Sequence, residues 1–330
     1  MTSLILGAGY LGAALADHLC AAGQPVVAAD NGFATDWAVL ERLRGRWPHL
    51  LRLELCDIRD AAAVDAAFQA AAPVESVYLL AAQASAHAGA APAEYTEETN
   101  LRGPRHVLEA AAQHGCPPVV YGSSFHVYGA GLTGVIDEKH SYGAFRDLSH
   151  LSKVYAEKLG ELHARQHGVA FAALRLGVVY GIGPLVKRDL RFVTVPHAFA
   201  LRLLRQETLR VTTSGLAPMG FIHLHDAVAA IVAAPHLLSQ AGERYVPANA
   251  VGEVATVVAV ARAVAAAARA RGLAAEIELP ETAELATEGA PFTVATRLAD
   301  TGWSPTRRLD DEVGALLDHY AATPEAEAQP

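Results

Sequence analysis

Cysteine is scarce in this chain. Its three cysteines, Cys20, Cys56 and Cys116, are too few and too far apart for a disulfide framework or a cysteine-rich zinc site. The first residues run directly into an apolar strand, without the basic region, hydrophobic segment and cleavage site of a secretory signal. Both absences favour a reducing environment, and we predict a cytoplasmic protein.

Positive charge is also in short supply. The sequence has 26 lysines and arginines, of which only four are lysines, against 35 aspartates and glutamates, and its net charge is -9. A protein that binds nucleic acid through the phosphates needs a basic surface, so we expect no nucleic-acid partner. The balance still allows a small anionic ligand held by a few local arginines.

Apolar runs long enough to cross a membrane are missing as well. The alanine-rich stretch Val254–Ala270 is interrupted by Arg262 and Arg269, and it is short for a membrane span. We predict a buried helix there and no membrane partner.

The first 180 residues alternate between short β-branched runs and longer amphipathic stretches. The runs predict buried strands at Leu4–Leu6, Val26–Ala29, Leu51–Leu55, Val74–Leu80, Val119–Tyr121 and Val169–Leu174. The amphipathic stretches predict helices at Leu11–Ala22, Asp60–Ala71, Ala93–His114 and Leu148–Gln166. Such alternation is typical of an α/β fold with a Rossmann-type, doubly wound parallel sheet.

After Gly181 the regularity ends, and prolines separate shorter elements. We therefore expect a Rossmann domain followed by a smaller C-terminal α/β lobe that binds the substrate. The predicted boundaries are 1–180 for the first domain with 217–240 returning to it, 181–216 and 241–320 for the substrate lobe, and 321–330 for a disordered tail.

A glycine pattern, Gly7, Gly9 and Gly12, comes directly after the first strand and opens a helix. Its glycines permit a tight turn, close approach to a pyrophosphate and close helix packing, and the helix N-terminus attracts phosphate. Asp30 ends the second strand at about the 20-residue spacing expected for an acidic residue that binds the adenosine ribose. Because Asp30 would repel a 2′-phosphate, the pattern predicts NAD rather than NADP. Asp57, after the third strand, is expected to contact the adenine or to cap the helix from Asp60.

Over nearly its whole length the chain resembles the extended short-chain dehydrogenase/reductase family of NAD-dependent epimerases and dehydratases, of the UDP-galactose 4-epimerase type. The similarity rests on the glycine pattern, the segment Tyr121–Gly129, Ser152-Lys153 with Glu157, the segment Arg175–Gly181, and later motifs. It implies NAD contacts for Gly7, Gly9, Tyr10, Leu11, Gly12, Asp30, Asn31, Asp57, Ile58, Leu80, Ala81, Ala82, Gln83, Asn100 and Lys153.

Three positions depart from the family's pattern. Ser149 stands where the family has its catalytic tyrosine, four residues before Lys153. Met219 replaces an arginine that commonly holds the nucleotide diphosphate, and Val178 replaces an asparagine that often contacts substrate. The residues expected to bind the cofactor are therefore kept, while residues expected to carry out the chemistry and to recognise the nucleotide are changed.

The resemblance implies catalytic roles for Ser124 and Lys153, but the missing tyrosine needs a substitute. Serine is a poor base, whereas histidine transfers protons well near neutral pH. On a helix, Ser149 lies about 40° and His150 about 60° from Lys153, so both share the face of the lysine. His126 occupies the position where related dehydratases have a catalytic glutamate.

Either histidine, or both, could act as acid or base; the alternatives are a surface or capping role for His150 and entry of Tyr142 from the preceding loop. His223, His225 and Asp226 form too small a set for a metal site, and none is predicted. We expect His223 to border the cleft and Asp226 to cap the next helix. The residues expected to bind substrate are Ser124, His126, Val178, His223, Arg188 and Arg191, with Lys187, Arg202 and Arg210 as further candidates for its diphosphate.

The leading hypothesis is an isomerase or lyase that oxidises a nucleotide sugar with bound NAD and passes through a transient keto intermediate, as an epimerase or dehydratase. The first alternative is a dehydrogenase or reductase of a less polar alcohol or ketone, because Met219 and Val178 remove polar contacts. The second is a catalytically retired NAD-binding protein, because Ser149 replaces the tyrosine. Relatives pack the helices that match Ala93–His114 and Leu148–Gln166 into a four-helix bundle, which predicts a homodimer.

Overall fold

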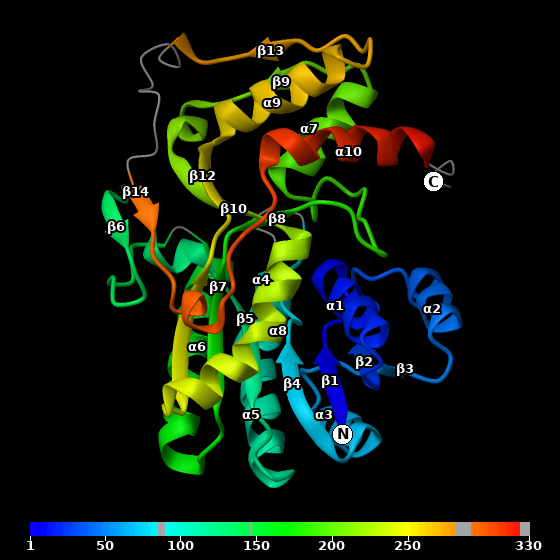
Figure 1. The fold of residues 1–330 in the computed structure, drawn as a ribbon, viewed down its shortest axis with the longest axis vertical. Coiled ribbons are helices and arrows are strands. Elements are labelled where there is room, and N and C mark those ends of the chain that lie inside the picture. Colours follow the sequence, from blue (N-terminus) through cyan, green and yellow to red (C-terminus); the bar gives the residue numbers. More distant parts are fainter. Residues whose placement is uncertain (85–89, 146, 282–291, 324–330) are drawn as a thin grey trace.

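A computed structural model describes residues 1–84, 90–145, 147–281 and 292–323. Its centre is one seven-stranded sheet in which every neighbouring pair is parallel (Figure 1). The order is β11-β7-β5-β4-β1-β2-β3. The strands are β1 (Thr2–Leu6), β2 (Val26–Asp30), β3 (Leu51–Leu55), β4 (Val74–Leu79), β5 (Val119–Ser124), β7 (Phe171–Leu176) and β11 (Tyr245–Ala250). The predicted α/β, doubly wound fold is confirmed.

Helices cover both faces of this sheet, as the apolar runs of its strands require. They are α1 (Tyr10–Ala21), α2 (Trp37–Arg46), α3 (Ala61–Ala71), α4 (Ala93–Glu97), α5 (Gly103–Gln113), α6 (Leu148–His167) and α8 (Leu224–Ala241). Along β1, Ile5 packs in the core formed with α1, α2 and α8, whereas Leu4 and Leu6 pack in the core formed with α3, α5 and α6. Alternate side chains of a strand therefore fill two separate cores.

The prediction of one continuous helix at Ala93–His114 is wrong. The segment divides into α4, a π-helical turn at Glu98–Arg102, and α5. Pro104 lies in the first turn of α5 and has no N–H to donate to the preceding turn, which accounts for a break at this position. The turn directs Asn100 into the interior, where it is buried. Helix α2, whose first turn is capped by the Asp36 side chain, was not predicted from the sequence.

A second lobe lies at the carboxyl ends of the strands (Figure 1). It contains a three-stranded sheet of β8 (Val178–Tyr180), β10 (Pro218–His223) and β12 (Glu253–Thr256). The helices α7 (Val195–Leu204), α9 (Val257–Arg269) and α10 (Leu309–Ala322) pack together beside it. There are also two strand pairs, β6 (Gly134–Ile136) with β14 (Phe292–Val294) and β9 (Leu209–Arg210) with β13 (Ile277–Glu278), and short 3-10 helices at Phe125–Tyr128, Thr213–Leu216 and Arg297–Thr301.

The structure corrects several predicted boundaries. β11 lies at the edge of the main sheet, although 241–320 was assigned to the substrate lobe, because its apolar residues pair with β7. Within 217–240, α8 packs on the main sheet but β10 joins the small sheet. The helix predicted from Val254 begins at Val257, after Thr256 has capped it. The predicted disordered tail begins inside α10, and its residues from 324 onward lie outside the described part of the chain.

Within the described ranges, no helix combines the length and apolar character needed to span a bilayer.

Candidate active site

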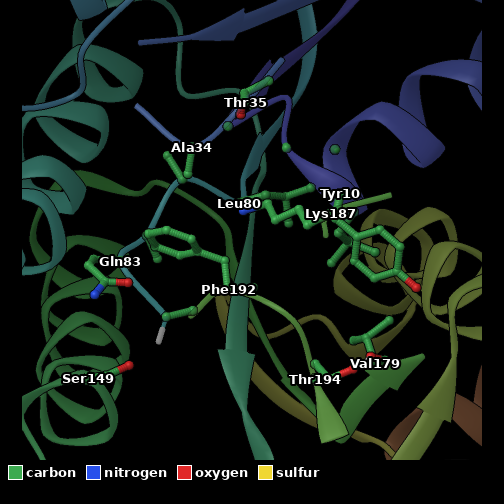
Figure 2. Close-up of a pocket in the computed structure, with 18 of the residues that line it drawn as sticks. Tyr10, Ala34, Thr35, Leu80, Gln83, Ser149, Val179, Lys187, Phe192 and Thr194 are labelled. Atoms are coloured by element: carbon green, nitrogen blue, oxygen red, sulfur yellow. Dashed lines mark hydrogen bonds between the residues drawn. The ribbon is translucent and has the colours of Figure 1, made fainter. Parts of the chain in front are cut away.

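A cavity of about 590 Å³ lies between the carboxyl ends of the main strands and the second lobe. In open α/β sheets this crevice is the usual place for a ligand. One end is formed by residues near Thr35, and Ser149 lies at the other (Figure 2). The cavity therefore brings residues of the predicted cofactor site and of α6 into one continuous space.

The glycine loop is built for close approach to a ligand. Gly7 has a φ of +102°, and a Cβ there would lie 2.2 Å from the backbone nitrogen of Ala81. A Cβ on Gly12 would lie 2.0 Å from the carbonyl oxygen of Gly7. At Gly9, in contrast, a Cβ would meet only the Thr35 hydroxyl, at 3.6 Å, so this glycine leaves the cavity open rather than relieving a clash.

Gly9 is also the N-cap of α1, and no side chain caps that end. The first N–H groups of the helix therefore remain available to a phosphate. Asp30 and Asn31 line the same cavity, and one Asp30 carboxylate oxygen accepts a hydrogen bond from the Gly32 backbone at 2.8 Å. A glycine loop, a free helix N-terminus and an acidic side chain fit the phosphates and ribose of a dinucleotide.

Asp57 does not line the cavity, whereas its neighbours Cys56 and Ile58 do, and its contact with the cofactor stays a prediction. Its carboxylate binds Arg59 at 2.7 Å, and hydrogen bonds from Arg59 lower the pKa of Asp57 to about 2. The Asn31 side chain donates to Asp57 at 3.1 Å. The alternative prediction, that Asp57 caps the next helix, is wrong.

That cap is Asp60, which accepts a hydrogen bond from the Ala62 backbone at 2.9 Å. Asn100 does not line the cavity, and its contact with the cofactor stays a prediction. Its carboxamide bonds both the N–H and the carbonyl of Gln83 at 2.8 Å, and it donates to the Ser152 hydroxyl at 3.0 Å. Asn100 therefore holds the loop after β4 against α6, while Leu80, Ala81, Ala82 and Gln83 line the cavity.

Lys153 projects from α6 into the cavity and is 6% exposed. Its ammonium donates to the Gly122 carbonyl at 2.7 Å and lies 4.8 Å from the Tyr121 ring centroid. Burial lowers the pKa of Lys153 to about 8, against an opposing effect from the buried Glu157 carboxylate. Lys153 can therefore change its charge close to neutral pH.

Two histidines, His126 and His150, line the same cavity as Lys153. The rings of His126 and His150 stack, with centroids 4.6 Å apart and planes 20° from parallel. His126 Nδ1 lies 3.2 Å from the Ser124 hydroxyl, and His150 Nδ1 lies 2.6 Å from a carboxylate oxygen of Asp147. Burial, with a contribution from His150, lowers the pKa of His126 to about 4. At neutral pH His126 is therefore uncharged.

Asp147 was not singled out from the sequence. It is the N-cap of α6, accepting a hydrogen bond from the His150 backbone at 2.9 Å while its second oxygen takes the ring nitrogen. An aspartate three residues before a histidine at a helix start is the sequence signal that could have found this pair. His150 thus has a capping partner and a place in the cavity wall at once.

Ser149 is 5% exposed and lines the cavity, and its carbonyl accepts a hydrogen bond from the Ser152 hydroxyl. Tyr142 does not replace the missing tyrosine, as one prediction allowed. Its hydroxyl donates to Glu157 at 2.9 Å, on the interior side of α6, and it does not line the cavity. Burial raises the pKa of Tyr142 to about 12, which removes it further from proton transfer.

The residues predicted to bind substrate separate into two groups. Ser124, His126, Val178 and Arg191 line the cavity. Arg188 does not, because its guanidinium bonds the backbone of Tyr320 and the backbone and side chain of Thr323. Among the further candidates for the substrate diphosphate, Lys187 lines the cavity, whereas Arg202 and Arg210 do not.

His223 also lies outside the cavity wall, contrary to prediction, and it rather than Asp226 is the N-cap of α8. Its side chain accepts a hydrogen bond from the His225 backbone at 3.2 Å. Asp226 instead accepts hydrogen bonds from the backbones of Thr306 and Arg307, so it ties α8 to the segment before α10.

The fold and the cavity together define a dinucleotide-binding enzyme of the Rossmann type. Residues 3–246 match the NAD dependent epimerase/dehydratase family, and the chain belongs to that family. The resemblance seen in the sequence is thereby confirmed, and NAD is the cofactor.

The chain is similar to curated proteins with several activities. It is 27% identical over 178 residues to UDP-glucose 4-epimerase of Bacillus subtilis, covering 54% of this chain and 52% of the relative. It is 28% identical over 232 residues to UDP-N-acetyl-alpha-D-glucosaminuronate decarboxylase of Bacillus cytotoxicus, covering 69% and 68%. The match thus spans about half the length of the first relative and two thirds of the second.

Solved structures resemble the whole fold. UDP-glucose 4-epimerase from Bifidobacterium longum, in complex with NAD⁺ and UDP, superposes with a TM-score of 0.83 at 19% identity, covering 98% of this chain and 99% of that one. The Thermus thermophilus UDP-glucose 4-epimerase, in complex with NAD, gives 0.79 at 24% identity, covering 98% and 100%. At these identities the likeness establishes the fold.

Proposed function

We propose that this protein is an NAD-dependent enzyme of the epimerase or dehydratase type that acts on a nucleotide sugar through a transient keto intermediate. One observation carries the proposal. Ser124, Lys153 and the His126–His150 pair line one end of a cavity whose walls also include the glycine loop and Asp30. Named activities of relatives, a UDP-glucose epimerase and a UDP-sugar decarboxylase, support the substrate class.

His150 takes the proton of the reacting hydroxyl in this proposal. The Asp147 carboxylate accepts from Nδ1–H, which leaves Nε2 as the basic nitrogen and fixes the ring. His126 is uncharged at neutral pH. It can therefore orient the substrate hydroxyl by hydrogen bonding, but in this proposal it does not take the proton. Ser124, 3.2 Å from His126, completes the hydrogen bonds to the same substrate oxygen.

Lys153 has the second duty. When bound, NAD supplies the hydride acceptor for the oxidation. The buried ammonium, held by the Gly122 carbonyl, is placed to bind the nicotinamide ribose and to stabilise negative charge that develops on the substrate oxygen. Arg191 is the cavity-lining arginine that we assign to a substrate phosphate; it forms an ion pair with Asp189 at 2.6 Å, which limits its reach.

A second candidate function is oxidation or reduction of a less polar alcohol or ketone. Val178 lines the cavity at the position where the family often has a substrate-binding asparagine, which gives that wall apolar surface. A screen of UDP-, dTDP- and GDP-sugars by thermal stabilisation separates the two, because a ligand that binds only the folded protein raises its stability. Stabilisation by simple alcohols but by no nucleotide sugar would favour the second function.

The proton-transfer assignment is tested with His150→Gln on the substrate found in that screen. We expect turnover to fall about 100-fold or more, as for loss of a general base, with NAD affinity nearly unchanged. His236→Gln is the matched control, because His236 is exposed and pairs only with Gln240 in the described structure. Asp147→Asn should lower turnover less and displace the pH profile. Full turnover in His150→Gln would contradict the assignment.

We also propose that the protein is a cytoplasmic homodimer. Leu151, Tyr155 and Leu162 are 50%, 43% and 46% exposed, although all are large and apolar. At about 100° per residue they share one face of α6, and such a face is typical of a subunit contact. A second copy of the chain that presents the same face would cover it through a two-fold axis.

A further inference from the structure

The segment after β8 is attached to the glycine loop by buried polar contacts. The Tyr10 hydroxyl, one residue after Gly9, donates to the Gly181 carbonyl at 2.6 Å and lies 3.4 Å from His197 Nε2. On its other side His197 binds the Tyr320 hydroxyl at 2.9 Å. Tyr320 in turn donates to the Lys187 carbonyl at 2.9 Å. The backbone of Lys187 is therefore fixed relative to the start of α1.

From this fixed backbone the Lys187 side chain enters the cavity. Figure 2 shows it beside Tyr10 and Leu80, and all three line the cavity wall. Only four lysines occur in the chain, and two of them, Lys153 and Lys187, line this space.

The ammonium of Lys187 lacks an anionic partner in the part of the chain that is described. No carboxylate there forms an ion pair with it, and the ammonium lies over the Phe192 ring, 5.3 Å from its centroid. Burial lowers the pKa of Lys187, while the Asp30 and Asp189 carboxylates, neither of which forms an ion pair with it, act in the opposite direction. A part-buried cation without a counter-ion costs free energy, so the site favours an incoming anion.

The surroundings identify that anion. The uncapped N-terminus of α1, at Gly9, and the side chain of Lys187 line the same cavity. Backbone N–H groups and a lysine together form a phosphate-binding arrangement. Asp30, which fits the adenosine ribose, lies near enough to influence Lys187, and the diphosphate of a dinucleotide follows that ribose directly.

We propose that Lys187 binds the diphosphate bridge of NAD, so that the second lobe as well as the glycine loop holds the cofactor. The network Tyr10–His197–Tyr320 positions the lysine for this contact. The inference rests on NAD being the cofactor and is independent of the reaction proposed above.

The test is calorimetric titration of the full-length protein, freed of bound nucleotide, with NAD, ADP, adenosine and UDP. Lys187→Met should weaken NAD and ADP about tenfold or more, since a charge-assisted hydrogen bond is lost, and leave adenosine unchanged. Lys187→Arg keeps the charge and should recover most of the affinity. Lys158→Met is the matched control, because Lys158 is 56% exposed and pairs with Glu161.

Unchanged NAD affinity in Lys187→Met would overturn the proposal. Equal weakening of ADP and adenosine would also overturn it, because the defect would then lie in the structure of the cavity rather than in phosphate binding. A loss confined to UDP would overturn the assignment to NAD and identify the substrate diphosphate as the ligand. Loss of turnover in His150→Gln bears on none of these outcomes, so the two proposals fail separately.

Discussion

The imidazole rings of His126 and His150 lie face to face, with centroids 4.6 Å apart, in the wall of the cavity. Asp147 is hydrogen-bonded to the ring of His150, and Ser124 to the ring of His126. A positive charge on one ring disfavours a positive charge on the other, because like charges at this distance repel. Burial and the neighbouring His150 ring lower the pKa of His126 to about 4, so His126 is uncharged near neutral pH.

Buried histidines make the protein sensitive to acid. Burial lowers the pKa of His126 and of His197 to about 4, from an ordinary value of 6.5. Between pH 6.5 and 4 the unfolded chain therefore binds protons that the folded protein does not, and stability falls as the pH falls through this window. For His197, which is 4% exposed, we expect a loss of about 2 kcal/mol between pH 7 and pH 5.

Denaturant unfolding at the two pH values measures this loss, and His197→Asn should remove its share of the pH dependence. His236→Gln should not alter the dependence, because His236 is exposed. If the free energy of unfolding depends on pH identically in wild type and His197→Asn, the pKa of His197 is not lowered in the folded protein and the prediction is wrong.

Restoring the tyrosine tests whether the site has been rebuilt. In Ser149→Tyr the new ring would enter the cavity beside His150, because Ser149 lines it and is only 5% exposed. We expect turnover to fall about tenfold or more while NAD still binds, since in the proposed mechanism His150 already performs the proton transfer and the new ring would obstruct it. Steady-state kinetics measure the first effect and calorimetry the second. A gain of turnover would instead indicate a site that had lost its catalyst.

Asp30 should set the choice of cofactor. Its carboxylate lines the cavity and would face the added phosphate of NADP. We expect NAD to bind at least about 100-fold more tightly than NADP, and Asp30→Ala to narrow that gap mainly by weakening NAD. Titrations of both cofactors against both proteins measure the ratio. Equal affinities in the wild type would contradict the role of Asp30.

The exposed apolar face of α6 should control assembly. Leu151→Glu combined with Leu162→Glu introduces charge where a two-fold contact would bury leucine, and light scattering should show a monomer. Leu55→Glu is the control, since Leu55 is 76% exposed but lies on β3, away from α6. A wild-type protein that stays monomeric at every concentration would rule out the homodimer.

The sequence alone determined the α/β class, NAD as the cofactor and the family. These follow from local patterns, because a glycine turn, a strand-helix alternation and a motif position depend on residues close together in the chain. It also identified Ser124, Lys153, His126 and His150 as cavity candidates, since each occupies a motif position or a helix face.

Tertiary packing decided which side chains are held by contacts with other parts of the structure. Asp57, Asn100, Arg188 and His223 fit the family's pattern or the expected charge, yet each is held by a partner that the linear sequence does not reveal. The same holds for Lys187, whose place in the cavity depends on contacts from Tyr320, 133 residues away. Local patterns specify which groups are present, whereas the long-range contacts that bury or pair those groups specify which of them remain free to meet a ligand.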